Sequence, residues 1–307
     1  MRSFGLKLAG LGNRETEQPA SIRQRAEETA ARLPPLLVAA ERIAATVAQG
    51  VHGRRRVGQG ESFWQFRRYQ QGDPVQRIDW RQSAKREHLY VRENEWEAAQ
   101  SVWVWLDRSA SMQYHSKDGL PDKADRATVL MLALSSLLIR GGERVTLLGS
   151  GVPPSNGRAV MDRLVASISL EDSVEESAPP LEQLPRYGRV VMISDFLTPP
   201  DEIEQTLRVF ASLGVRGHLL QIFDPAEQSL PFAGRVRFEG LEGEGEALIG
   251  RVEAVKAEYV LLMEKHRRAI EDIARRLGWT CIAHATDQPP QTALLALYHA
   301  LAETPES

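Results

Sequence analysis

The chain contains few of the features that mark several large classes of protein. It has a single cysteine, Cys281, among 307 residues, so a framework of internal disulfides is excluded, and this usage is typical of a reducing compartment. The longest nearly apolar run, residues 129–139, is far shorter than the roughly 20 residues that cross a bilayer. The first 18 residues also lack an apolar core of the kind found in signal peptides. A cytoplasmic protein without a transmembrane segment is therefore expected.

The sequence also lacks a strong net charge and the common motifs for zinc and ATP. A net charge of -3 gives no overall attraction to nucleic acid or to anionic membranes. The seven histidines and the one cysteine show no zinc-ligand spacing such as His-Glu-x-x-His. No Gly-x-x-x-x-Gly-Lys motif is present, so any ATP would have to be bound by another protein.

Residues 101–307 alternate between apolar strands and amphipathic helices. This pattern predicts an α/β domain with a mostly parallel sheet and helices on both faces. Strands are predicted over residues 102–106, 145–148, 189–193, 217–223 and 279–285, and helices over 127–138, after 200, 251–277 and 291–302, with a hairpin over 235–248.

The first 50 residues are expected to form a separate N-terminal segment. Residues 1–18 show no periodicity and are interpreted as a flexible start. Apolar residues at helical spacing follow. Pro34 and Pro35 are expected to divide this stretch into two N-terminal helices, and Gly50 is expected to end the second.

Residues 51–100 concentrate arginines, acids and aromatic residues. Alternation over residues 88–96 suggests a strand, so a small Arg- and aromatic-rich β module is expected before the α/β domain. Its ten Lys and Arg residues face seven Asp and Glu residues, and this near-balance favours internal ion pairs over a nucleic-acid surface. Nucleic-acid binding through the basic and aromatic stretch 54–68 remains an alternative.

Two of the predicted strands end in a carboxylate. Asp107 follows the first strand of the α/β domain, and Asp195 follows the third. Ligands of open α/β sheets bind beyond the carboxyl ends of the strands. If these two strands are neighbours, Asp107, Ser109, Ser111 and Asp195 meet at one edge of the sheet. Mg²⁺ and Mn²⁺ prefer such oxygen ligands, so the four residues form a candidate metal site.

The same residues allow two other interpretations. Their side chains could cap the backbone amides of a strand-to-helix turn. A serine nucleophile would need an adjacent base and an oxyanion hole. No Gly-x-Ser-x-Gly elbow surrounds Ser109 or Ser111, and the nearest histidine, His115, lies past the turn in a polar loop. Because no such base is found, a non-enzymatic role is expected. The enzymatic alternative is a metal-dependent hydrolase at this edge of the sheet.

The segment Asp107-Arg108-Ser109-Ala110-Ser111 resembles the metal-ion-dependent adhesion motif of von Willebrand factor A-type domains, and Asp195 is similar to that family's later acidic position. The resemblance implies a von Willebrand A-like, Rossmann-type fold. It also implies a protein-binding site in which the two acids and the two serines hold the ion.

The adhesion family usually adds a threonine from a loop between these two acidic positions. This sequence has no threonine between Thr146 and Thr198, and Ser173 is a candidate to replace it.

The block upstream of Asp107 is similar to the signature of the Domain of Unknown Function 58 family. The matching segments are Gly58-Gln59-Gly60-Glu61-Ser62-Phe63, Arg67-Arg68-Tyr69, Gly72-Asp73-Pro74, Arg77-Ile78-Asp79-Trp80, Ser83-Ala84-Lys85, Val91-Arg92-Glu93 and, later, Asp224-Pro225-Ala226-Glu227. The resemblance implies a partner of the MoxR-type AAA+ ATPase class. With the adhesion-type site, it implies an adaptor in protein assembly or remodelling, whose client protein the sequence does not identify.

Overall fold

The computed structural model describes residues 6–8, 22–52, 62–69, 78–85, 88–95, 99–157, 159–170, 178–241 and 245–302. The chain forms two compact units. The larger unit contains residues 1–50 and 100–307, and the smaller unit contains residues 51–99. Among the residues that the structure describes, no helix has both the length and the apolar character of a transmembrane span.

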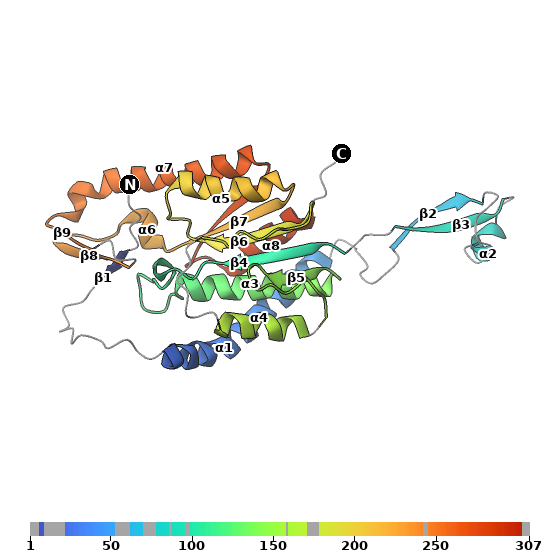
Figure 1. The fold of residues 1–307 in the computed structure, drawn as a ribbon, viewed down its shortest axis with the longest axis horizontal. Helices are drawn as coiled ribbons and strands as arrows, with labels where there is room; N and C mark the ends of the chain where they lie inside the picture. Colours follow the sequence, from blue (N-terminus) through green and yellow to red (C-terminus); the bar gives the residue numbers. More distant parts are fainter. Residues whose placement is uncertain are drawn as a thin grey trace. The chain divides into compact units, whose positions relative to one another are not determined.

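The centre of the larger unit is a five-stranded sheet in which all paired strands run parallel (Figure 1). The strands are β4 (Ser101–Leu106), β5 (Arg144–Leu147), β6 (Arg189–Ser194), β7 (Arg216–Phe223) and β10 (Thr280–Ala285). Their order in the sheet is β10-β7-β6-β4-β5, so the direction of winding reverses between β4 and β6. Ligands of open α/β sheets bind at this kind of switch point. The prediction of a largely parallel α/β sheet is confirmed.

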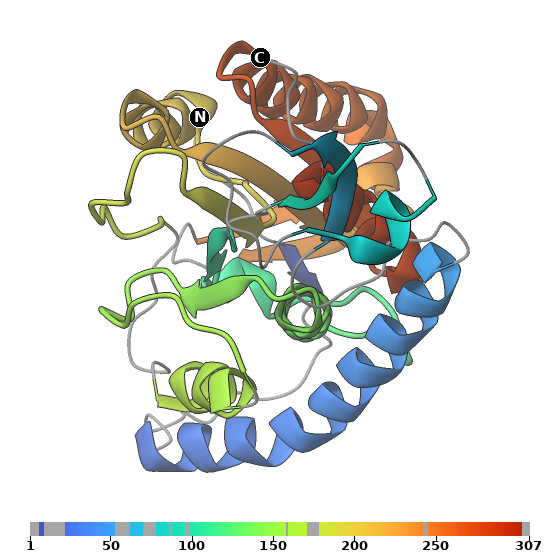
Figure 2. The same cartoon turned by 90° about the vertical axis from the view of Figure 1, so that its right-hand side faces the viewer.

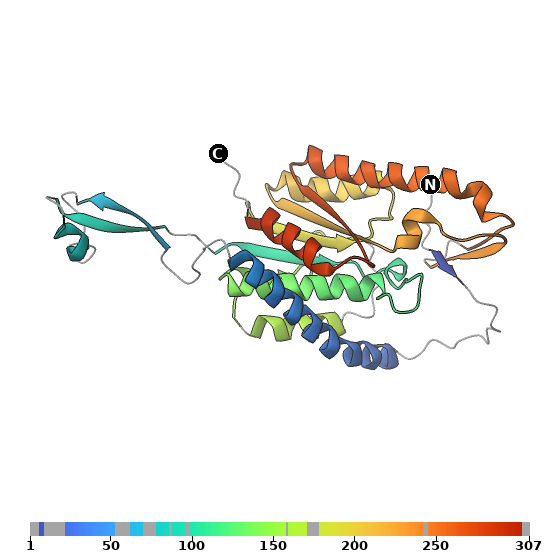
Figure 3. The same ribbon diagram turned by 180° about the vertical axis from the view of Figure 1, so that it is seen from behind.

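Helices cover both faces of this sheet. They are α3 (Lys123–Arg140), α4 (Ala159–Leu170), α5 (Pro200–Ser212), α7 (Val252–Arg276) and α8 (Pro290–Ala302). Figures 1 and 3 show α5 and α7 on one face and α3 on the other, where α8 packs beside α3. Sequence periodicity predicted all of these helices except α4, although its buried residues Val160, Leu164 and Ile168 do have helical spacing.

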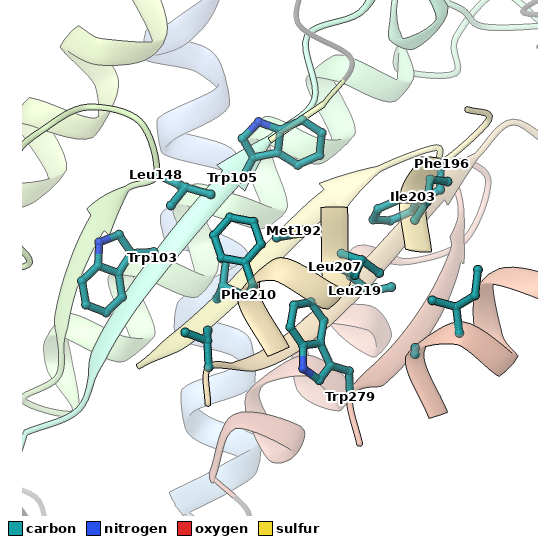
Figure 4. Close-up of a cluster of buried hydrophobic side chains, with 14 of the residues drawn as sticks. Trp103, Trp105, Leu148, Met192, Phe196, Ile203, Leu207, Phe210, Leu219 and Trp279 are labelled. Carbon is teal, nitrogen blue, oxygen red and sulfur yellow. The ribbon is translucent and has the colours of Figure 1, made fainter. Parts of the chain in front are cut away.

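A cluster of large apolar side chains fills the space between the sheet and α5 and α7 (Figure 4). Trp103 and Met192 reach it from β4 and β6, and Phe210 and Ile270 reach it from the two helices. Fully burying a side chain of this size contributes about 1.5–3 kcal/mol. This packing fixes β4 and β6 side by side, and it thereby fixes the positions of the loops that follow them.

The N-terminal residues 6–8 form a strand, which the sequence did not indicate. This strand, β1 (Leu6–Leu8), pairs antiparallel with β8 (Val236–Gly240), which in turn pairs with β9 (Glu246–Ile249). The flexible start predicted for residues 1–18 is therefore wrong for these three, because an open edge of β8 can pair with a segment too short to show periodicity. The rest of that stretch lies outside the described residues, and the predicted hairpin over 235–248 is confirmed.

The prediction of two helices divided at Pro34 and Pro35 is also wrong. A single helix, α1 (Ile22–His52), runs through both prolines and past Gly50. A proline inside a helix removes one hydrogen bond and costs about 3 kcal/mol. Packing after the prolines offsets this cost, because one face of α1 is buried and Ser136 of α3 donates to the Glu41 carboxylate at 2.9 Å. Figure 2, viewed almost along α3, shows α1 and α4 on the side of α3 away from α5 and α7.

The described part of the smaller unit consists of a strand pair and a short helix. Its strand β2 (Ser62–Arg68) pairs antiparallel with β3 (Tyr90–Glu95), which corresponds to the strand expected over residues 88–96. Its short helix α2 (Trp80–Ser83) begins at Asp79, whose side chain accepts a hydrogen bond from the Gln82 amide at 2.9 Å. Residues 54–61 of the basic stretch lie outside the described residues.

Two buried histidines on the sheet predict a loss of stability in mild acid. Burial and nearby arginines lower the pKa of His218 and of His284 to about 4. The unfolded chain therefore binds more protons than the folded chain between about pH 6.5 and pH 4. The free energy of unfolding should fall as the pH is lowered through this window, by up to about 3 kcal/mol for each histidine. Denaturant unfolding at a series of pH values measures this slope.

The matched variants for this prediction are His218→Gln, His284→Gln and His299→Gln. His299 is exposed on α8, so its replacement controls for the loss of a histidine outside the buried sheet. The first two replacements should each flatten the slope. An equal slope in all the proteins would show that the two buried histidines bind protons equally well in the folded and unfolded states.

Candidate functional site

The structure brings the two strand-end carboxylates to the same edge of the sheet. Asp107 follows β4 and Asp195 follows β6, and these strands are hydrogen-bonded neighbours. The Asp107 amide donates to the Ile193 carbonyl at 2.9 Å, which extends the pairing one residue beyond β4. Asp107 and Asp195 therefore lie at the switch point of the sheet, and both are 3 % exposed.

Ser109 and Ser111 connect the two acids through hydrogen bonds. The Ser109 amide donates to Asp107 Oδ1 at 2.8 Å. The Ser111 hydroxyl donates to Asp195 Oδ2 at 2.7 Å, and its oxygen lies 3.0 Å from Ser109 Oγ. Because Ser111 has one proton, Ser109 must be the donor between the two hydroxyls. The four residues that the sequence singled out thus form one continuous, buried polar chain, which we call the rim site.

The interpretation that these side chains cap backbone amides holds for the two acids but not for the serines. The Asp107 and Asp195 carboxylates accept hydrogen bonds from the amides of Ser109 and Leu197. Ser109 precedes the 3₁₀ turn η2 (Ala110–Met112), yet its side chain makes no cap hydrogen bond. The Ser109 and Ser111 hydroxyls therefore face the acids, where they can serve as neutral oxygen ligands.

The residue after Asp195 has a strained backbone. Phe196 has a φ of 50°, a region that side chains other than glycine rarely adopt. Its amide donates to Ser194 Oγ at 2.8 Å, and its carbonyl accepts from His266 Nε2 at 2.6 Å. Ser194 Oγ in turn donates to Asp107 Oδ2 at 2.5 Å. Strain of this kind clusters at functional sites, and Ser194 at the end of β6 holds Asp107 of the neighbouring strand.

A buried lysine and a third acid extend the rim site beyond what the sequence predicted. Lys123, the first residue of α3, is fully buried. Its ammonium group donates to Asp195 Oδ2 at 2.8 Å and to Glu227 Oε1 at 2.5 Å. Glu227 belongs to α6 (Pro225–Ser229), where it forms a capping box with Asp224.

Both residues did leave a signal in the sequence. Lys123 stands four residues before Ala127 and seven before Leu130, so it continues the apolar stripe of α3 toward its start. The Asp-x-x-Glu spacing of Asp224 and Glu227, directly after a strand, is that of a capping box. Neither signal showed that the two side chains would meet.

The two aspartates of the rim site differ in how well their negative charges are compensated. Burial, followed by the charge of Asp195, raises the pKa of Asp107 to about 7. Burial lowers the pKa of Lys123, but the charges of Asp195 and Glu227 outweigh this effect, so its pKa lies above the usual range and the group remains an ammonium. The ammonium of Lys123 therefore neutralises the charge of Asp195. In contrast, the hydrogen bonds described above connect Asp107 only to neutral groups, the Ser109 amide and the Ser194 hydroxyl.

The two serine oxygens of the rim site have the spacing of adjacent ligands of a small divalent ion. Two adjacent ligands of an octahedron with bonds of about 2.1 Å lie about 3.0 Å apart, and the two serine oxygens are 3.0 Å apart. Among the described residues, no group of three or more His, Cys, Asp or Glu is arranged to hold a metal. Any ion here would therefore depend on hydroxyls as well as acids. Ser173, the candidate for the missing threonine, lies outside the described residues.

The geometry disfavours a serine nucleophile. The Ser111 proton points to a carboxylate that already accepts from Lys123, and no imidazole contacts either serine within the described part of the chain. Because the pKa of Lys123 is raised, its ammonium cannot act as the missing base near neutral pH. His115 instead pairs with Asp122, on the loop before α3.

Comparison with known proteins gives relatives that extend over most of the chain. Two proteins described as uncharacterized, one from Mycobacterium tuberculosis and one from Mycobacterium bovis, are each 26 % identical over 259 residues, which cover 79 % of this chain and 80 % of theirs.

Two solved structures also align with 66 % of the chain. One is an aerotolerance-related membrane protein from Bacteroides fragilis, with a TM-score of 0.41, 17 % identity and 99 % of its own chain covered. The other is the conserved hypothetical protein BatB from Bacteroides thetaiotaomicron, with a TM-score of 0.37, 16 % identity and 98 % covered.

The signature segments from Arg67 onward and four of the five strands of the parallel sheet, β4 to β7, fall in a region that matches one protein family. Residues 65–269 match the family described as "Protein of unknown function DUF58". This match spans well over half of the chain, from β2 in the smaller unit to α7 in the larger. The chain therefore belongs to the DUF58 family.

Proposed function

We propose that the chain is a non-enzymatic protein-binding adaptor whose rim site holds Mg²⁺, or Mn²⁺, in a von Willebrand A-like fold. The observation that carries this proposal is the 3.0 Å separation of the Ser109 and Ser111 hydroxyl oxygens between two buried carboxylates. Ser109 and Ser111 are the direct ligands. Asp107 and Asp195 act from either side of them, directly or through water.

The charges of the rim site support a cation as its ligand. When all three acids are ionised, Asp107, Asp195 and Glu227 outnumber the single ammonium of Lys123 by two charges in a buried setting. Burial raises the pKa of Asp107 to about 7 and also raises the pKa of Glu227, so a bound cation would favour the fully ionised site. Isolated buried charge is costly. One divalent ion would balance the site, and its open coordination positions would attract an acidic side chain of a partner protein.

In this proposal, the partner protein is a MoxR-type AAA+ ATPase. The resemblance of the signature segments to the DUF58 family supports this choice of partner. The chain itself has no phosphate-binding Gly-x-x-x-x-Gly-Lys motif. Energy for assembling or remodelling a client protein would then come from the ATPase, and the rim site would supply the contact.

Titration with Mg²⁺ and Mn²⁺ by calorimetry tests the site. The wild type should bind one ion, and Asp107→Ala should weaken binding about 10–100-fold, the range found when a supporting residue of a metal site is lost. Asp107→Asn, which retains an oxygen that can accept from the Ser109 amide, separates loss of charge from loss of shape. Asp118→Ala, an exposed acid on the loop that follows Ser111, should bind as the wild type does.

Capture of the ATPase by the same proteins tests the adaptor role. Ion-dependent capture that Asp107→Ala abolishes would support it. If the wild type binds neither ion at millimolar concentration and Asp107→Ala still captures the ATPase, the rim site is not an adhesion site. Binding of single-stranded nucleic acid that falls steeply with salt and survives Asp107→Ala would instead favour the stretch 54–68.

A further inference from the structure

We infer that Lys123 is a built-in cation of the rim site that sets how strongly it binds a divalent ion and keeps the ion-free site assembled. This inference rests on the proposed function, because it concerns the same ion. Lys123 comes from the start of α3, whereas the metal ligands come from the loops after β4 and β6. It has no counterpart among the ligands that the sequence predicted.

The position of Lys123 places its charge within reach of any ion held by the serines. Lys123 Nζ and Ser111 Oγ both bond to Asp195 Oδ2, at 2.8 and 2.7 Å. The two atoms are therefore at most about 5.5 Å apart, well inside the screening length of about 8 Å at physiological salt. Because Lys123 is fully buried, water screens its charge little, so the ammonium must repel a bound divalent ion.

Lys123 also joins three loops of the edge through its own hydrogen bonds. It connects Asp195, after β6, to Glu227, after β7, and its own amide donates to the Tyr114 carbonyl in the loop after β4, at 3.2 Å. A site held only by a metal would lose its organisation when the metal leaves. Here the ammonium replaces part of that role, so the ion-free site should remain formed and bind its ion weakly.

A charge series at two positions tests the inference. Glu227→Gln leaves the rim at a formal charge of -1. The wild type and the double variant Lys123→Met/Glu227→Gln both have -2, and Lys123→Met has -3. Glutamine can still accept from the Asp224 amide as the glutamate does. The dissociation constant for Mn²⁺ is measured from the paramagnetic resonance of free Mn²⁺. It should be highest in Glu227→Gln, intermediate in the wild type and the double variant, and lowest in Lys123→Met.

The expected steps are large. Each unit of charge should change the Mn²⁺ dissociation constant about tenfold or more, given the short separation and the burial. The wild type and the double variant should agree within about threefold. Unfolding temperatures with Mn²⁺ and with a chelator give a second readout, in which Mn²⁺ should stabilise Lys123→Met much more than it stabilises the wild type. Lys256→Met, an exposed lysine on α7, is the control and should match the wild type in both readouts.

The outcomes separate this inference from the proposed function. Wild-type binding with no tighter binding in Lys123→Met overturns the inference alone. Binding by Lys123→Met but not by the wild type supports Lys123 as the cation of the site and overturns the wild-type metal site. Absence of binding in every protein overturns both. If Lys123→Met does not fold, the comparison of Glu227→Gln with the double variant decides, since the double variant must bind Mn²⁺ about tenfold more tightly.

Discussion

Replacing Lys123 with methionine is expected to lower the free energy of unfolding by about 3–5 kcal/mol in the absence of divalent ions. Methionine fills a similar volume, so packing is largely kept. The loss comes from Asp195 and Glu227, which would stay buried without the ammonium that contacts both. Folded domains are stable by only about 5–15 kcal/mol, so this single change removes a large part of the total. Urea unfolding in the presence of a chelator measures it.

The double variant Lys123→Met/Glu227→Gln provides the matched control. It removes one charge of each sign, so most of the stability should return, because a buried ion pair is often replaceable by neutral groups at little cost. Equal destabilisation of the single and double variants would show that the unpaired charge of Glu227 is not a source of the loss.

Replacing Gly217 with alanine is expected to cost at least about 3 kcal/mol, the upper end of the usual overpacking range. A Cβ atom built on Gly217 of β7 would lie 1.8 Å from Cε3 of Trp279. Real carbon atoms cannot approach so closely, and the indole cannot easily move because it is 6 % exposed within the apolar core. Thermal unfolding of the variant measures the loss.

Two further variants show whether this contact is the cause. Gly250→Ala adds a methyl group where nothing lies within 4 Å of the new Cβ, and it should change stability by less than about 0.5 kcal/mol. Trp279→Leu makes room at the contact, so Gly217→Ala should cost much less in that background than in the wild type. Additive losses would contradict the steric explanation.

Local patterns in the sequence were sufficient to predict the sheet and the position of the candidate site. Continuous apolar runs predicted β4 and β6, because strands that are buried on both faces have no polar positions. Asp107 directly follows the first run, and Asp195 follows the second after Ser194. Parallel strands bring such positions to one edge, so the meeting of the two loops followed from topology.

The features that the sequence did not predict depend on contacts between distant residues. A lysine at the start of a helix is usually solvated, and Lys123 is buried only because Asp195 and Glu227, 72 and 104 residues away, surround it. The continuity of α1 through Pro34 likewise depends on the surface that α3 offers. Sequence periodicity shows which face of a helix or strand is apolar. It does not show which distant residues will offset the free-energy cost of a buried charge or of a proline inside a helix.

The packing of α1 on α3 has a consequence during synthesis. The apolar face of α1, with Ala40 and Val47, is covered in the finished protein, and Ser136 of α3 reaches back 95 residues to Glu41. Ribosomes add about 5–20 residues each second, so this face stays without its partner for roughly 5 to 20 s while the intervening chain emerges. A nascent chain of this protein therefore exposes an apolar surface on the α1 segment early in synthesis. Chaperones should bind mainly to this segment before α3 is made.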